Sequence, residues 1–268
     1  MDNQKVKSEF VFIHGYTGGP TDFADLPEVL QKEFHADVFC PLLPGHGTNI
    51  KDLLGLTEED LLRDVEPHIR HSLAEGRQVI LVGLSFGAQA ALYLASKYHV
   101  AGVVALGTTH RLKFPFNTPG VGLLRFFKRV WKKRFTHVEL EHRERAVYYD
   151  SMPFDGLFIC RRLSALVEKG AGRIRCPVLF LHSEHERLGD PNALAGLKRR
   201  IAGPVDIRFL RDNNHSMFFS TIKEEINREI VNFFRRFRLC VDTAAAPVQR
   251  SAQYHSARRS VAPRAASG

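Results

Sequence analysis

Six short apolar segments recur along the chain, and most of the longer stretches between them have helical periodicity. The segments are residues 10–14, 36–41, 79–83, 100–106, 177–182 and 205–210. They are rich in Val, Ile, Leu and Phe with little alternation, which is typical of strands buried on both faces of a sheet. This order predicts the α/β class, with a mostly parallel central sheet flanked by helices. We expect those helices at residues 22–34, 57–75, 86–98, 192–201 and 221–238.

The size and charge of the chain limit its partners. Its 268 residues suit one large α/β domain, and its net charge of +9 suggests an anionic partner. No nucleic-acid-binding motif accompanies that charge, so we expect no nucleic acid. The polar N-terminus and the lack of a long apolar run predict a soluble, cytoplasmic protein. Its four widely spaced cysteines predict neither a metal site nor a disulfide framework.

Two regions interrupt the alternation of strands and helices. Residues 111–170 carry no clear strand, which predicts a helical lid or cap inserted into a core made of residues 1–110 and 171–240. Residues 241–268 are rich in Ala, Ser, Arg and Pro, which predicts a disordered basic tail.

The sequence GLSFG at residues 83–87 lies between an apolar strand and a helix rich in small residues. A serine at a sharp strand-to-helix turn needs small neighbours, and its hydroxyl is then exposed at the edge of the sheet. The pattern therefore predicts Ser85 as a nucleophile. A serine hydroxyl needs an adjacent base, and His215 is the candidate because it follows the last predicted strand.

Three carboxylates, Glu184, Glu186 and Asp190, follow the preceding strand, and any of them could orient the histidine. Acyl transfer also needs two N–H donors for the oxyanion. We assign these to Phe86, directly after the nucleophile, and to Tyr16 in the glycine-rich loop HGYTGGP. His14 in that loop is interpreted as structural.

The segments VFIHGYTGG, PLLPGHGTN, GLSFG, CPVLFLHSEHERLGDP and NNHSMFF carry a family resemblance. Over residues 8 to about 238 the chain resembles the α/β-hydrolase superfamily, and within it the small bacterial carboxylesterases and monoacylglycerol lipases. In that family a segment such as ARHDEMVNP holds the acid, and the resemblance implies Glu186 at its place. Glutamate replaces the usual aspartate there, and Pro191 follows one residue later than in the family.

The resemblance implies a serine hydrolase that cleaves a small-molecule carboxylic ester with a hydrophobic acyl chain and needs no cofactor. A thioesterase or a lysophospholipase would use the same machinery, and a non-catalytic protein that binds a hydrophobic ligand is the alternative from another class. Residues 121–133 form a predicted basic amphipathic helix. It has two interpretations: a lid over the acyl pocket, or peripheral contact with an anionic membrane.

Overall fold

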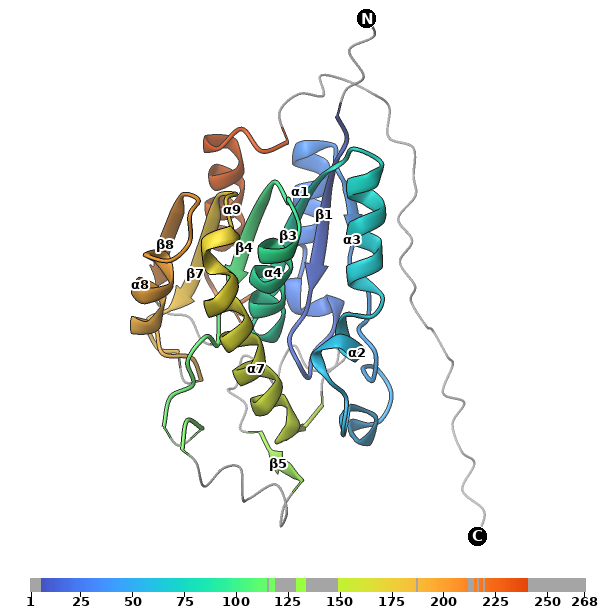
Figure 1. Cartoon of the computed structure of the whole chain (residues 1–268), viewed down its shortest axis with the longest axis vertical. Coiled ribbons are helices and arrows are strands. Elements are labelled where there is room, and N and C mark those ends of the chain that lie inside the picture. Colours follow the sequence, from blue (N-terminus) through green and yellow to red (C-terminus); the bar gives the residue numbers. More distant parts are fainter. Residues whose placement is uncertain are drawn as a thin grey trace, which may run out of the picture.

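The centre of the protein is a six-stranded parallel sheet (Figure 1). The structure, a computed structural model, describes residues 6–114, 116–118, 129–133, 149–186, 188–211, 215, 217–218 and 220–240. The strand order is β2-β1-β3-β4-β7-β8. All six predicted strands are confirmed: β1 (Ser8–Ile13), β2 (Asp37–Phe39), β3 (Gln78–Leu84), β4 (Gly102–Leu106), β7 (Val178–Ser183) and β8 (Val205–Leu210).

Helices cover both faces of the sheet, so its strands are apolar throughout. Leu81 of β3 packs into one core and its neighbour Val82 into the other, because successive side chains point to opposite faces. The first core is covered by α2 (Glu58–Leu62), α3 (Val65–Ala74), α4 (Phe86–Lys97), α7 (Asp155–Gly170) and α8 (Asn192–Lys198). The second is covered by α1 (Leu26–Phe34) and α9 (Lys223–Arg236).

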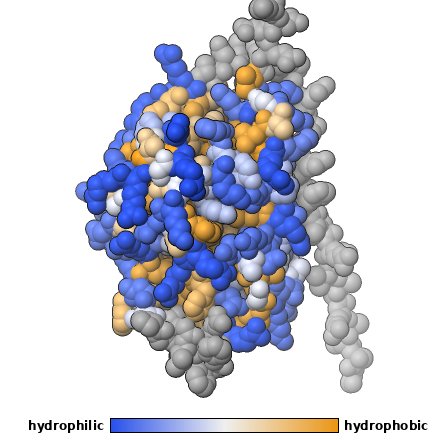
Figure 2. Space-filling view, in the orientation of Figure 1, coloured by the Kyte–Doolittle hydropathy of each residue, from blue (hydrophilic) through white to orange (hydrophobic). Residues whose placement is uncertain are grey.

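Figure 2 shows that one face is covered largely by hydrophilic side chains, with apolar ones between them. Within the described ranges, no helix combines the length and the apolar character needed to cross a bilayer.

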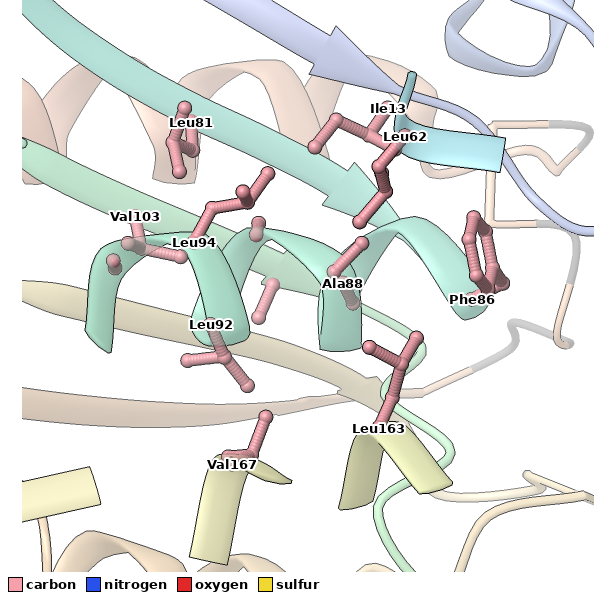
Figure 3. Packing of buried hydrophobic residues seen from close by; sticks show 14 of the residues in the cluster. Ile13, Leu62, Leu81, Phe86, Ala88, Leu92, Leu94, Val103, Leu163 and Val167 are labelled. Atoms are coloured by element: carbon pink, nitrogen blue, oxygen red, sulfur yellow. The ribbon is translucent and has the colours of Figure 1, made fainter. Parts of the chain in front are cut away.

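Helix α4 connects the sheet to α7 and fixes the start of the site. Its small residues, such as Ala88, let it approach the strands closely. Figure 3 shows Leu94 directed toward Val103 of β4, whereas Leu92 faces Val167 of α7. Because α4 is packed on both sides, its first residue is held at the carboxyl edge of the sheet.

Several predicted helices differ in their bounds, and the one expected over residues 22–34 begins only at Leu26. The helix expected over residues 57–75 is divided into α2 and α3, because Pro67 has no N–H to donate to the carbonyl of Arg63. The helix expected over residues 221–238 is shorter, since α9 begins at Lys223, without a side-chain cap, and ends at Arg236. The start of α9 is held instead by Lys223, whose Nζ lies 2.9 Å from Asp25 Oδ2.

The described part of the insertion contains a small antiparallel sheet, β5 (Val130–Lys132) with β6 (Ser151–Pro153). The helix expected over residues 121–133 is therefore wrong at its end, where the branched and aromatic pair Val130 and Trp131 favours a strand. The Trp131 ring packs on Phe154, with ring centroids 5.3 Å apart. Residues 121–128, and the tail predicted at 241–268, lie outside the described residues.

Candidate active site

Ser85 lies at a tight turn between β3 and α4. Its backbone has φ 56° and ψ −111°, a combination that residues other than glycine rarely adopt. A Cβ added at Gly83 would overlap the backbone of Gly87, and one added at Gly87 would overlap the carbonyl of Ile13. Both glycines of GLSFG are thus required by the close approach of α4 to β3 and β1. This is the strained elbow that the motif predicts.

His215 connects Ser85 to Glu186. Its Nε2 lies 2.8 Å from Ser85 Oγ, and its Nδ1 lies 2.8 Å from Glu186 Oε2. An ionised carboxylate can only accept hydrogen bonds, so Nδ1 carries the ring proton and Nε2 accepts from the serine hydroxyl. In this tautomer the imidazole can remove the proton of Ser85.

The other two candidate carboxylates are engaged elsewhere. Asp190 Oδ1 accepts hydrogen bonds from the backbone N–H and the side-chain amide of Asn192, at 3.0 and 3.1 Å. Glu184 lies 3.7 Å from Arg211 Nε. Of the three carboxylates, the structure brings Glu186 to the histidine, although the loop is one residue longer than in the resembling family.

The carboxylate of Glu186 is buried and strongly held. Its Oε1 accepts from the N–H groups of Leu188, at 2.7 Å, and Gly189, at 3.4 Å. Burial alone would raise its pKa, but the positive charge of His215 and the hydrogen bonds from His215 and Leu188 outweigh it and bring the pKa of Glu186 to about 2. Glu186 is therefore ionised at neutral pH and can stabilise a protonated His215.

Phe86 directly follows Ser85 in the chain, and the loop that contains Tyr16 lies beside the serine. Phe86 is the first residue of α4, so its N–H has no partner within the helix. A Cβ at Gly15, the residue before Tyr16, would lie 3.8 Å from Ser85 Cβ. The two aromatic rings are buried and meet with centroids 6.3 Å apart. The backbone of both residues is thus fixed beside Ser85.

Two buried histidines hold the loop that contains Tyr16. His14 Nε2 accepts from the N–H of Leu43 at 3.0 Å, and its Nδ1 lies 2.9 Å from the carbonyl of Gly15. His46 Nε2 lies 2.7 Å from the carbonyl of Tyr16. Burial, together with the nearby His46, lowers the pKa of His14 to about 3. His14 is therefore neutral and structural, as its position in the loop suggests.

Two residues of the insertion contact the site loops and were missed by the sequence analysis. Lys113 Nζ donates to the carbonyl of Glu186 at 2.7 Å. Tyr149 donates its hydroxyl to the carbonyl of Gly45 at 2.9 Å and its backbone N–H to that of Thr17 at 3.3 Å. Neither lies in a motif, so only the three-dimensional structure reveals these contacts.

In the part of the chain that the structure describes, no three His, Cys, Asp or Glu side chains are grouped so that they could hold a metal ion. Each of the four cysteines is a free thiol.

Comparison with known proteins identifies the family. The model of the alpha/beta hydrolase family matches residues 10–229. A thermostable monoacylglycerol lipase from Bacillus sp. (strain H-257) is 26% identical over 187 residues, which is 68% of this chain and 71% of the lipase.

Solved structures share the fold. A structure from work on the metagenome-derived lipolytic enzymes LipS and LipT has a TM-score of 0.73 at 20% identity, covering 86% of this chain and 95% of its own. The monoacylglycerol lipase of Paleococcus ferrophilus has a TM-score of 0.69 at 19% identity, covering 87% of this chain and 97% of its own. Since the family model spans most of its sequence, the chain belongs to the alpha/beta hydrolase family.

Proposed function

We propose that the protein is a serine hydrolase that cleaves carboxylic esters of a hydrophobic monoacyl substrate. The observation that carries this proposal is the hydrogen-bonded series Ser85, His215 and Glu186 at a strained strand-to-helix turn. The likeness to a curated monoacylglycerol lipase supports the class of substrate.

The reaction follows from this geometry. His215 Nε2 takes the proton of Ser85 as Oγ attacks the ester carbonyl, and Glu186 stabilises the imidazolium that forms. The developing oxyanion accepts from the N–H groups of Tyr16 and Phe86. His215 then returns the proton to the departing alcohol and leaves an acyl-enzyme. Water, activated by the same histidine, releases the acid in a second cycle.

An apolar cluster next to Tyr16 supports a hydrophobic acyl group. A Cβ at Gly156 would overlap the Tyr16 ring, so the start of α7 lies directly against Tyr16. Phe154 and Leu157 lie within two residues of that glycine. They pack with Leu112, Phe116, Trp131 and Met152 in a small cluster that meets the first main core at Met152. A long acyl chain would be stabilised by removing its surface from water against such side chains.

We also propose that the insertion, residues 111–170, covers the site and meets an anionic membrane peripherally. Arg129 and Lys132 are exposed at β5, on either side of the half-buried Trp131. This combination of basic and aromatic side chains suits the interface of a bilayer that carries anionic lipids.

A fluorophosphonate probe and a panel of p-nitrophenyl esters test the proposed reaction. The probe should label the wild-type protein at Ser85 and should not label Ser85→Ala. Turnover should rise with acyl length, and the corresponding thioesters and lysophospholipids, tested side by side, determine which leaving group is preferred. Folded protein that neither reacts with the probe nor turns over any ester would be a ligand-binding protein, which would overturn the proposal.

A further inference from the structure

Asp22 is a buried carboxylic acid that the proposed reaction does not use. It lies in a 3₁₀ turn, η1 (Pro20–Phe23), directly after the loop that contains Tyr16, and its exposed fraction is 3%. A carboxylate is rarely buried without a partner, since removing it from water is costly. Its surroundings therefore indicate what it does.

The Asp22 carboxyl lies inside the loop of residues 15–19. The backbone of Gly15 and Gly19, at the two ends of that loop, lies close enough to the carboxyl to lower its pKa. A Cβ at Gly18 would overlap the carboxyl, so glycine at this position leaves the space that the acid fills. The loop is thus wrapped around one carboxyl group, which bridges its first and last residues.

Asp22 also lies close to the nucleophilic serine. A Cβ at Gly15 would lie 3.5 Å from Asp22 Oδ2 and 3.8 Å from Ser85 Cβ, so the acid and the nucleophile lie on the same side of Gly15. Gly15 shares its next peptide bond with Tyr16, whose N–H is the proposed oxyanion donor. Asp22 therefore holds the residue whose backbone angles determine where that N–H points.

We propose that Asp22 is a positioning residue that aligns the Tyr16 N–H with the oxyanion through its close contacts with Gly15 and Gly18 of the loop. The inference rests on the proposed ester hydrolysis and deepens it. Asp22 has no contact with substrate in this role, because it acts through Gly15. Displacing an oxyanion donor weakens an interaction that exists only in the transition state, so kcat should fall while KM stays near its original value.

The charged and titratable groups around Asp22 come from three other segments. They are Lys133 at the end of β5, His215, and the thiol of Cys40 after β2. Burial raises the pKa of Asp22 to about 7, against the opposing effects of the loop N–H groups and the two cations. Its Oδ1 has no hydrogen-bond partner among the described residues. Asparagine keeps the shape of the side chain and one acceptor oxygen but removes the charge that strengthens its contacts with the loop, which makes it an informative replacement.

The test compares Asp22→Asn with the matched control Asp25→Asn. Asp25, the residue before α1, is half-exposed and paired with Lys223, so its replacement by asparagine should leave kcat and KM unchanged. Asp22→Asn should lower kcat by roughly 10- to 100-fold at nearly constant KM, with kcat counted per fluorophosphonate-reactive site. The affinity for a trifluoromethyl ketone, which forms a tetrahedral oxyanion on Ser85, should fall by the same factor.

The outcomes separate a positioning role from a structural one. If Asp22→Asn melts at a lower temperature but keeps the wild-type kcat and ketone affinity, or gains activity, the inference is wrong. If it does not fold, Gly18→Ala decides the question, because it keeps the acid but displaces it, and a kcat equal to the wild-type value would overturn the inference. Absence of ester turnover in the wild type itself would overturn the proposed function, and this inference with it.

Discussion

The acid of the site shows how one extra methylene group can be accommodated. Glu186 stands where the resembling family has aspartate, and the loop after it is one residue longer. The longer side chain still reaches His215, because the N–H groups of Leu188 and Gly189 fix its other oxygen. The resemblance pointed to Glu186, and the structure brings its carboxylate to His215, whereas its other hydrogen-bond partners follow from the path of the loop and could not be inferred.

Replacing Glu186 tests its role directly. Glu186→Gln keeps the size of the side chain but removes the charge that orients and stabilises the imidazolium, so kcat should fall by roughly 10³- to 10⁴-fold. Asp190→Asn is the matched control, since Asp190 binds Asn192 and should leave kcat unchanged. Steady-state kinetics on one p-nitrophenyl ester compares them, and the reverse pattern would assign the acid to Asp190.

The depressed pKa of Glu186 also has a consequence for stability. Its pKa is about 2 in the folded protein against an ordinary value of 4.5, so folding favours the ionised form. That stabilisation is complete above pH 4.5 and is lost as the pH falls from 4.5 to about 2. Urea denaturation across this range should show the wild type losing unfolding free energy faster than Glu186→Gln. Parallel losses in the two proteins would contradict the lowered pKa.

At the scale of elements, both ends of the insertion are attached to loops of the site. Its first residues pair with the loop of the acid, through a bridge between Leu112 and Gly189 and a 2.8 Å hydrogen bond from Lys113 N–H to the Leu188 carbonyl. Its last part holds the loop of Tyr16 through Tyr149. A displacement of the insertion would therefore be transmitted to Glu186 and to Tyr16, the proposed acid and oxyanion donor.

The Lys113 side chain offers a test of this connection. Lys113→Met keeps the length of the side chain but removes its hydrogen bond to the Glu186 carbonyl, which should destabilise the protein by about 1–3 kcal/mol and lower kcat by a few-fold. Lys51→Met, at an exposed lysine of η2 (Ile50–Leu53), is the control. Thermal melts and ester kinetics measure both effects, and a kcat identical to that of the control would show that the contact does not position the acid.

The elements differ in how far the sequence predicts them. The strands and α4 were predicted because their apolar runs are long and their burial is uniform, and Ser85 because GLSFG has a local steric cause. The break at Pro67 is also local and could have been recognised. The strand at Trp131 depends on pairing with residues 151–153, and the Lys113 contact joins residues 73 positions apart. Such long-range pairings leave no local pattern.

At the scale of the whole molecule, the net charge of +9 is unevenly distributed. Residues 1–110 carry 8 basic and 14 acidic side chains, whereas residues 111–240 carry 26 basic and 14 acidic ones. The strand order places β2 and β1, from the acidic part, at one edge of the sheet, and β7 and β8, from the basic part, at the other. The excess of positive charge is therefore carried by the second half of the chain, which also supplies β7 and β8.

This asymmetry predicts binding to anionic vesicles that depends on salt. Raising the salt from about 0.1 M to about 1 M shortens the Debye length from about 10 Å to about 3 Å, so electrostatic binding should weaken steeply. Arg129→Glu with Lys132→Glu should weaken binding by roughly 10-fold or more, since each basic residue contributes about 1 kcal/mol near such a surface. Arg70→Glu with Lys51→Glu makes the same change in net charge within the acidic part of the chain. If both pairs weaken co-sedimentation equally, net charge drives the binding, and a lid that only covers the acyl site becomes the better interpretation of the insertion.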